Sequence, residues 1–229
     1  MGKNIFSMNG ISKIYSSDEM DTYALKSVDL TINAGDFISI SGPSGCGKST
    51  LLSIIGLLDA YSSGNYSIDG QNVATLSNEQ AAQIRANKFG FIFQSFNLLD
   101  ELSVFDNIAL PLNYSKTSFN SKEIKEKVER CLEKVDMTHR INHKPNQLSG
   151  GQQQRIAIAR ALVNSPSLLL VDEATGNLDS TTGKKVMEMI VELNNEGTAV
   201  CLVTHEQHFA QMAKRKFKLL DGELKEHAE

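Results

Sequence analysis

The sequence predicts an α/β fold with a mainly parallel sheet, interrupted by an inserted helical stretch. Residues 168–171 are a continuous aliphatic run of strand length, which is typical of a central parallel strand covered on both faces. Strand-like and helix-like segments alternate on both sides of the stretch from residue 103 to about residue 135, where the pattern is helical. We find no internal repeat, low-complexity tract or linker, so we expect one compact domain.

The first half of the chain is expected to consist of short strands, turns and two helices. Residues 25–32 alternate between apolar and polar side chains, which predicts a strand with one buried face. Ser77 and Gln80 have the spacing of a capping box, which predicts a helix that runs to about Asn87. The other expected segments are a turn at 34–36, a strand over 37–41, a helix over 48–58 and a strand over 88–93.

The second half begins with the helical stretch and then returns to alternating strands and helices. Within the stretch, Ser103 marks the start, and Ser121 is the predicted N-cap of a charged helix. The apolar residues of that helix share one stripe: Ile124, Val128, Leu132 and Val135. The later expected segments are helices over 151–163 and 180–194, strands over 168–171 and 198–203, a short helix, and a hairpin around Asp221 and Gly222.

The composition favours a globular protein with no membrane span of its own. The apolar fraction of 41% is enough for a core, and the net charge of −4 lacks the basic excess of a nucleic-acid binder. The apolar run at 51–58 is far shorter than the ~20 residues that cross a bilayer, and residues 1–10 do not resemble a signal peptide. The cysteines lack CxxC spacing and are expected to be reduced thiols: Cys46, Cys131 and Cys201.

Residues 42–49 form a P-loop pattern between an expected strand and an expected helix. Glycines let backbone N–H groups close around phosphate oxygens without Cβ clashes, and the helix N-terminus adds its positive dipole end. Lys48 is expected to contact the β- and γ-phosphates of ATP, and Ser49 to ligate Mg²⁺. The nucleotide-binding residues predicted here are Gly42, Pro43, Ser44, Gly45, Cys46, Gly47, Lys48, Ser49 and Thr50.

A pair of acidic residues follows the aliphatic strand at 168–171. Asp172 comes first and is expected to lie beside the P-loop, where it can hold the Mg²⁺ shell. Glu173 reaches one residue further and is predicted to polarise an attacking water as general base. A strand that ends in a solvated acidic turn is common, so the order of the two motifs, with the helical insert between them, strengthens this interpretation.

Residues 148–152, Leu-Ser-Gly-Gly-Gln, followed by Gln-Gln-Arg, resemble the signature sequence of ABC ATPases. A glycine-rich turn that opens a helix is a second anion cradle. One nucleotide site has little use for two cradles unless the second serves a neighbour's nucleotide. The resemblance therefore adds these residues to the predicted ATP contacts: Ser149, Gly150, Gly151 and Gln152.

Other landmarks of that family occur in order along essentially the whole chain. Tyr15 matches the aromatic residue that stacks on adenine, although a tyrosine packed on a strand edge stays an alternative. Gln94 resembles the Q-loop glutamine that touches Mg²⁺, and residues 177–179 match the D-loop across the dimer interface. His205 matches the switch histidine that contacts the γ-phosphate. The resemblance thus implies Glu173, His205 and Gln94 as catalytic residues and Ser49, Gln94 and Asp172 as metal ligands.

The resemblance also implies a fold and a subgroup. It predicts a P-loop NTPase core over about 1–94 and 164–229, an N-terminal antiparallel β subdomain, and a helical subdomain over about 95–163, all within a single domain of residues 1–229. Residues 56–59, 94–99 and 175–179 look like the lipoprotein-releasing and macrolide-export group. One departure is Ala174, where that group usually has proline, so the local backbone is less restricted.

The expected function is ATP binding and hydrolysis in a head-to-tail ATP-sandwich dimer that drives a separate integral membrane permease. The likeness implies a second copy as partner, permease contacts at about 94–111, and a peripheral location on the cytoplasmic face of the membrane. A non-transport role, coupled to a membrane protein that controls cell-wall enzymes, stays open. Two other functions are disfavoured. A nucleic-acid- or ribosome-acting ABC ATPase usually carries two cassettes or a coiled-coil insert, whereas this sequence shows one cassette and no such insert. A non-catalytic scaffold would have a degraded site, whereas Glu173, His205 and Gln94 are all present.

Overall fold

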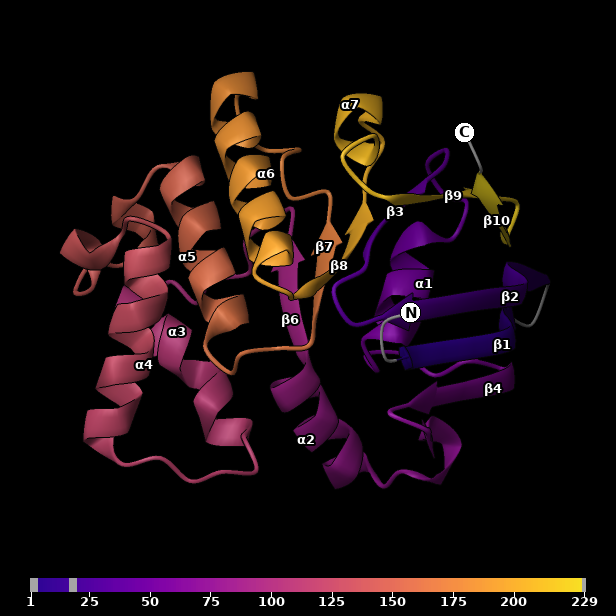
Figure 1. Ribbon diagram of the computed structural model, residues 1–229, viewed down its shortest axis with the longest axis horizontal. Coiled ribbons are helices and arrows are strands. Elements are labelled where there is room, and N and C mark those ends of the chain that lie inside the picture. The colour runs from indigo at the N-terminus through magenta and orange to yellow at the C-terminus, as the bar shows by residue number, and fades with distance from the viewer. Residues whose placement is uncertain (1–3, 17–19, 228–229) are drawn as a thin grey trace.

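The computed structural model describes residues 4–16 and 20–227, and these contain two sheets (Figure 1). The ends of the predicted domain, residues 1–3 and 228–229, lie outside the described residues. The smaller sheet is antiparallel and has the order β2-β1-β4-β5. Its strands are β1 (Asn4–Ser16), β2 (Asp21–Asn33), β4 (Ser63–Ile68) and β5 (Gln71–Asn72).

The larger sheet has the order β10-β9-β3-β8-β7-β6, and all its pairs are parallel except the β9–β10 hairpin. Its strands are β3 (Phe37–Ser41), β6 (Phe89–Phe93), β7 (Leu168–Asp172), β8 (Ala199–Val203), β9 (Arg215–Leu220) and β10 (Glu223–His227). The predicted fold class is therefore confirmed. Because the carboxyl ends of parallel strands share one edge, the residues that follow β3, β6, β7 and β8 meet there.

The helices cover the two faces of the larger sheet. Figure 1 shows α3, α4 and α5 grouped on one side of the molecule and the antiparallel sheet on the other, with α1 between the two sheets. The α-helices are α1 (Lys48–Ile55), α2 (Asn78–Lys88), α3 (Val104–Ala109), α4 (Ser121–Lys134), α5 (Gly150–Leu162), α6 (Ser180–Asn195) and α7 (Gln207–Ala210). Short 3₁₀ helices occupy Val73–Thr75, Leu110–Tyr114, Thr138–Arg140 and Pro145–Gln147.

Strand β7 separates two apolar clusters. Leu168 and Leu170 pack in the cluster that contains α1 and the antiparallel sheet, whereas Leu169 and Val171 pack in the cluster formed with α3 to α6. All four side chains are buried, as the aliphatic run predicts for a strand covered on both faces. The burial of both faces holds the end of β7 firmly in place, and Asp172 and Glu173 lie at that end.

Several predicted boundaries are wrong. The helix expected over 48–58 ends at Ile55, where Gly56 packs so closely on β6 and β7 that an added Cβ would lie 2.5 Å from the Phe91 ring. The helical stretch is not continuous, because a 3₁₀ helix with Pro111 as its second residue follows α3 and a break precedes α4. Asn120, not Ser121, is the N-cap of α4, because Asn120 and Glu123 form a reciprocal capping box. The Ser77–Gln80 capping box of α2 is confirmed.

Candidate nucleotide-binding site

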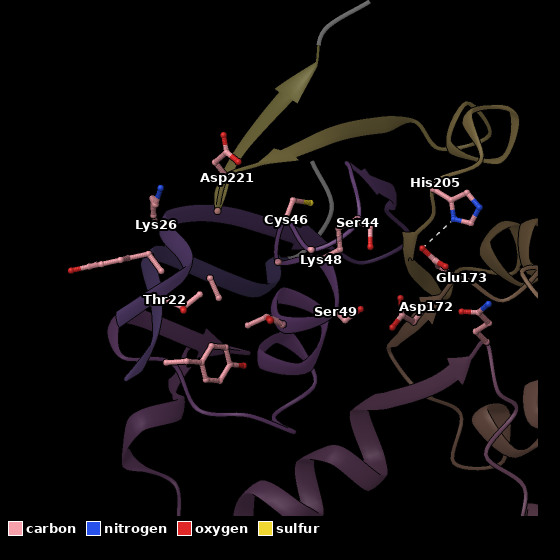
Figure 2. Close-up of a pocket in the computed structure, with 18 residues that line it drawn as sticks. Thr22, Lys26, Ser44, Cys46, Lys48, Ser49, Asp172, Glu173, His205 and Asp221 are labelled. Atoms are coloured by element: carbon pink, nitrogen blue, oxygen red, sulfur yellow. Dashed lines mark ion pairs between the residues drawn. The ribbon is translucent and has the colours of Figure 1, made fainter. Parts of the chain in front are cut away.

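A cavity of about 1000 Å³ opens at the carboxyl edge of the larger sheet (Figure 2). The P-loop and the start of α1 form one part of its wall, β2 and the β9–β10 turn form an adjoining part beside the P-loop, and Asp172, Glu173 and His205 lie on the other side of the loop (Figure 2). The cavity brings together most of the predicted site residues: Tyr15, Ser44, Gly45, Cys46, Gly47, Lys48, Ser49, Thr50, Gln94, Asp172, Glu173 and His205. Gly42 and Pro43 lie at the base of the loop instead of on the cavity wall, and the signature residues do not line it.

Backbone packing explains the glycines of the P-loop. A Cβ at Gly42 would lie 2.2 Å from the Leu219 carbonyl oxygen, and one at Gly47 would lie 2.4 Å from the Ala24 carbonyl oxygen. Gly47 also has a φ of +104°, which disfavours residues with a side chain. It is the N-cap of α1, and no side chain accepts a hydrogen bond at this helix start. The first N–H groups of α1 therefore remain available to an anion, which fits a phosphate cradle.

Lys48 lies across the P-loop. Its Nζ donates hydrogen bonds to the carbonyl oxygens of Gly42 at 3.0 Å and Pro43 at 2.8 Å. The residue is 8% exposed, so these carbonyls replace the water that a buried ammonium loses. Gly42 and Pro43 thus hold the lysine at the cradle, although they do not face the cavity.

Ser49 and Asp172 face one another beside the P-loop (Figure 2). The Ser49 hydroxyl is hydrogen-bonded to the Asp172 carboxylate. Burial raises the pKa of Asp172, and the nearby Glu173 charge adds to this, while the Ser49 hydrogen bond and the Lys48 charge oppose it. A hydroxyl and a carboxylate at a phosphate cradle are the oxygen ligands that Mg²⁺ prefers, so the donor set fits this ion.

Glu173 is held in an uncommon backbone conformation, with a φ of +47°. Its N–H donates to the Val203 carbonyl oxygen at 3.0 Å, and its own carbonyl oxygen accepts from the Gly176 N–H at 3.0 Å. The Glu173 Oε1 atom lies 3.2 Å from His205 Nδ1, and Figure 2 marks this contact with a dashed line. The turn thus aims a carboxylate at the cavity and orients it with a histidine. Ala174 is buried in this turn.

Gln94 connects the end of β6 to residues 177–179. Its Nε2 donates to Asn177 Oδ1 at 3.4 Å, and Asn177 Nδ2 donates to the Gln94 carbonyl oxygen at 2.9 Å. The next residue of that segment, Leu178, packs near Gly150, at the start of the signature helix α5. Gln94, Asn177 and Leu178 therefore form a chain of contacts from the cavity to the signature helix α5, although no signature residue lines the cavity.

The signature residues form the N-terminus of α5. Ser149 is the N-cap, and its side chain and that of Gln152 form a reciprocal capping box. Among the described residues, those that line the cavity include no residue of the range 149–152. An added Cβ at Gly150 would make only ordinary van der Waals contacts, the nearest with the Phe96 ring at 3.6 Å.

Sequence reasoning missed the part of the cavity wall that β2 and the β9–β10 turn form beside the P-loop. That wall contains Thr22, Tyr23, Ala24, Lys26, Asp221 and Gly222. It is assembled by a long-range hydrogen bond from the Lys26 N–H to the Gly222 carbonyl oxygen, at 2.8 Å. The alternation at 25–32 and the turn at Asp221 were the available signals, but neither indicated that the two segments meet.

A P-loop at the carboxyl edge of a parallel sheet, with an acidic pair at the end of a neighbouring strand, defines a nucleoside-triphosphate-binding protein of the P-loop class. Comparisons with known proteins narrow this class. The sequence profile described as "ABC transporter" matches residues 25–176. The chain belongs to the ABC transporter family, and within it is an ATP-binding cassette.

Relatives agree with the predicted subgroup. The chain is 47% identical over 215 residues to the macrolide export ATP-binding/permease protein MacB of Bdellovibrio bacteriovorus, a match that covers 94% of this chain and 32% of the relative. It is 45% identical over 220 residues to the ABC transporter ATP-binding protein MJ0796 of Methanocaldococcus jannaschii, a match that covers 95% of this chain and 94% of the relative. The chain spans about a third of the length of the MacB-type relatives.

The fold matches solved cassettes closely. A dimeric structure of MJ0796 in a post-hydrolysis state, bound to ADP and Pi, superposes with a TM-score of 0.89 at 42% identity, covering 97% of this chain and 98% of that chain. A second structure, of cbiO1 from Clostridium perfringens, has a TM-score of 0.84 at 26% identity and covers 97% of this chain and 87% of that one. Within residues 4–16 and 20–227, no helix is long and apolar enough to cross a membrane.

Proposed function

We propose that the chain binds and hydrolyses ATP and drives a separate membrane permease. The observation that carries this proposal is the joint position of Lys48, Ser49, Asp172, Glu173 and His205 around one cavity. A phosphate cradle, an oxygen-ligand pair and an oriented carboxylate are together the parts that triphosphate hydrolysis needs. The MJ0796 cassette bound to ADP and Pi supports the same reaction for this chain.

Each residue has a proposed role. Lys48 and the first N–H groups of α1 bind the phosphates, while Ser49, Asp172 and Gln94 hold Mg²⁺, which when bound would neutralise phosphate charge. Glu173 accepts a proton from the attacking water, and its carboxylate is oriented for this by the 3.2 Å contact with His205. Tyr15, which is 46% exposed and lines the cavity, stacks on the adenine.

The working unit is proposed to be a homodimer. The signature turn at 149–152 is a capped helix start that does not line its own chain's cavity, so its anion cradle is available to a second copy. A head-to-tail dimer places each signature over the partner's P-loop. The dimeric structures of MJ0796 support this arrangement. Gln94 and Asn177 connect the two sides of such a site through their mutual hydrogen bonds.

The permease is proposed to dock on an apolar groove between β6, α2 and the 3₁₀ helix at Leu110–Tyr114. The groove has a volume of about 550 Å³, and its rim contains the exposed side chains of Leu58 and Tyr114. It begins beside Gln94, since Phe93 and Asn97 both line it. Relatives named as ATP-binding/permease proteins support such a partner and a peripheral position on the cytoplasmic face of the membrane. The proposed role of ATP hydrolysis is to power export, or to transmit force across the membrane as in the macrolide-export and lipoprotein-releasing group.

Co-purification tests the whole proposal. The tagged chain is purified from detergent-solubilised native membranes, and the captured proteins are identified and searched for membrane-spanning permease sequences. The wild-type chain should retain one permease and hydrolyse ATP with Mg²⁺. The Tyr114→Glu variant should lose the permease but keep basal hydrolysis, because Tyr114 lies outside the nucleotide cavity. Capture of a cell-wall regulatory complex instead would replace transport with the alternative role.

A further inference from the structure

Tyr15 lines the cavity, but the residues that hold its side chain in place do not. Its hydroxyl donates a hydrogen bond to Asp59 Oδ2 at 2.8 Å, and the other oxygen of Asp59 accepts one from Lys13 Nζ at 2.7 Å. Lys13 Nζ also donates to the Ala60 carbonyl oxygen at 2.6 Å. Lys13, Asp59 and Ala60 are not among the residues that line the cavity, whereas Tyr15 is.

The network fixes both the edge and one face of the tyrosine ring. Lys13 Nζ lies 4.7 Å from the centroid of the Tyr15 ring, so the ammonium covers one ring face. Lys13 is only 9% exposed, so its ammonium group depends on Asp59 and Ala60 for hydrogen bonds. This dependence restricts the ammonium group to its position over the ring. With one face covered and the hydroxyl anchored, the remaining face is the one left for a flat ligand.

Asp59 is in turn fixed to the helix that carries the phosphate cradle. The N–H groups of Leu58 and Asp59 both donate to the Ser53 carbonyl oxygen in the last turns of α1, at 2.8 and 3.3 Å. Helix α1 begins at Lys48, in the P-loop. One short, rigid helix therefore joins the cradle at its start to the anchor of Tyr15 just beyond its end.

We propose that Asp59, supported by Lys13, is a positioning residue that holds Tyr15 for base stacking and fixes the spacing between the base and the phosphates. The inference rests on the proposed stacking role of Tyr15. Burial alone would raise the pKa of Asp59, but hydrogen bonds from Lys13, Tyr15 and Ala60 hold it below its usual value. The carboxylate is therefore charged at neutral pH, as both hydrogen bonds require.

The alternative is a purely structural role, in which the contacts of Asp59 join β1 to the end of α1 and have no effect on how the base binds. The two roles differ in their dependence on the ligand. A positioning role affects only ligands with a base, whereas a loosened α1 weakens every phosphate ligand. The test therefore compares the affinities of ATP and of inorganic tripolyphosphate, which has no base, measured by calorimetry on the full chain with EDTA to prevent hydrolysis.

Three variants carry the test, and a fourth is the matched control. Asp59→Asn and Tyr15→Phe should each weaken ATP binding roughly three- to tenfold, the range of one lost hydrogen bond, and leave tripolyphosphate unchanged. The double variant should lose less than the product of the two effects, because both remove the same contact. Asp69→Asn breaks another Asp–Lys pair of 2.7 Å, with Lys88, away from the cavity, and should change neither affinity.

Tyr15→Ala separates failure of this inference from failure of the proposed base stacking. It should weaken ATP by roughly fivefold or more, again with no effect on tripolyphosphate. If Tyr15→Ala weakens ATP while Tyr15→Phe and Asp59→Asn do not, the positioning role is overturned and stacking stands. If Tyr15→Ala leaves ATP binding intact, both are overturned. Equal losses of affinity for ATP and for tripolyphosphate would also overturn the positioning role. If Asp59→Asn does not fold, Tyr15→Phe alone still decides the test, because it removes the same hydrogen bond.

Discussion

Replacing Glu173 by glutamine removes the proposed general base and very little else. Glutamine has the same length and keeps an oxygen for the contact with His205, which in the native chain joins Oε1 and Nδ1 at 3.2 Å. The backbone φ of +47° is equally unfavourable for both residues, so the free energy of unfolding should hardly change. The substitution therefore tests chemistry with the fold held constant.

The expected loss follows from the position of the carboxylates. A positioned general base contributes about 10²–10⁴-fold, which corresponds to about 3–5 kcal/mol of barrier. Asp172, the neighbouring carboxylate, is engaged by the Ser49 hydroxyl at the proposed Mg²⁺ position, so it is badly placed to substitute. We therefore expect the upper half of that range. ATP binding should persist, because Lys48 and the P-loop are unchanged.

Phosphate release measures the rate, and size-exclusion chromatography with ATP and Mg²⁺ measures assembly. The Glu173→Gln variant should release phosphate at least about a thousandfold more slowly than the wild type. It should also elute as an ATP-bound dimer under conditions in which the wild type returns to monomer. A variant that keeps a rate within about tenfold of the wild type would refute Glu173 as the base.

Three further substitutions test the metal position and the loop. Asp172→Asn removes a carboxylate whose pKa is raised by burial, so its charged form opposes folding once the pH rises through that raised pKa. Without nucleotide, the variant should melt above the wild type near neutral pH, by a margin that disappears as the pH falls toward about 4, and its Mg²⁺-dependent ATP binding should weaken. A lower melting temperature at neutral pH would contradict this. Gly47→Ala should cost about 1–3 kcal/mol and abolish ATP binding, because the added Cβ would lie 2.4 Å from the Ala24 carbonyl oxygen. Gly45→Ala, with φ +78° but no neighbour within 4 Å of the added Cβ, should cost less in thermal unfolding, and equal losses would contradict the packing argument.

Short motifs with their own chemistry were predictable from the sequence. The P-loop, the strand over 168–171 and the Ser77–Gln80 capping box each depend on residues close together in the chain, and each is present in the structure. The parallel sheet followed from the alternation of strands and helices. Asp172 and Glu173 were predicted from the strand that they follow, whereas His205 was predicted from the resemblance to ABC ATPases; all three line the same cavity.

Features set by long-range contacts were not predictable. The cavity wall at Thr22 to Lys26 depends on a hydrogen bond with Gly222, and no local pattern at either segment encodes that pairing. Strand β1 is irregular, with several register shifts against β2, so its apolar residues do not alternate cleanly. The misplaced N-cap of α4 is different, because its signal is local: Asn120 and Ser121 are both good caps, and the capping-box spacing of Asn120 and Glu123 decides between them.

The central claim is that each ATP site is completed by a second copy of the chain. Two inactive variants test it: Lys48→Ala disables the P-loop, and Gly150→Asp places a negative charge in the signature turn. The chain should tolerate this substitution, since an added Cβ at Gly150 would make only ordinary van der Waals contacts, the nearest at 3.6 Å, and an acidic residue suits a helix N-terminus. Each variant should fold and hydrolyse almost no ATP alone.

Mixing the two variants is the decisive measurement. In a mixed dimer, the intact P-loop of the Gly150→Asp chain meets the intact signature of the Lys48→Ala chain, which restores one site. With equal amounts and random pairing, the mixture should recover up to about a quarter of the wild-type rate of phosphate release, since half of the dimers are mixed and each has one working site. A mixture as inactive as its separate components would show that P-loop and signature act within one chain, and would contradict the composite site.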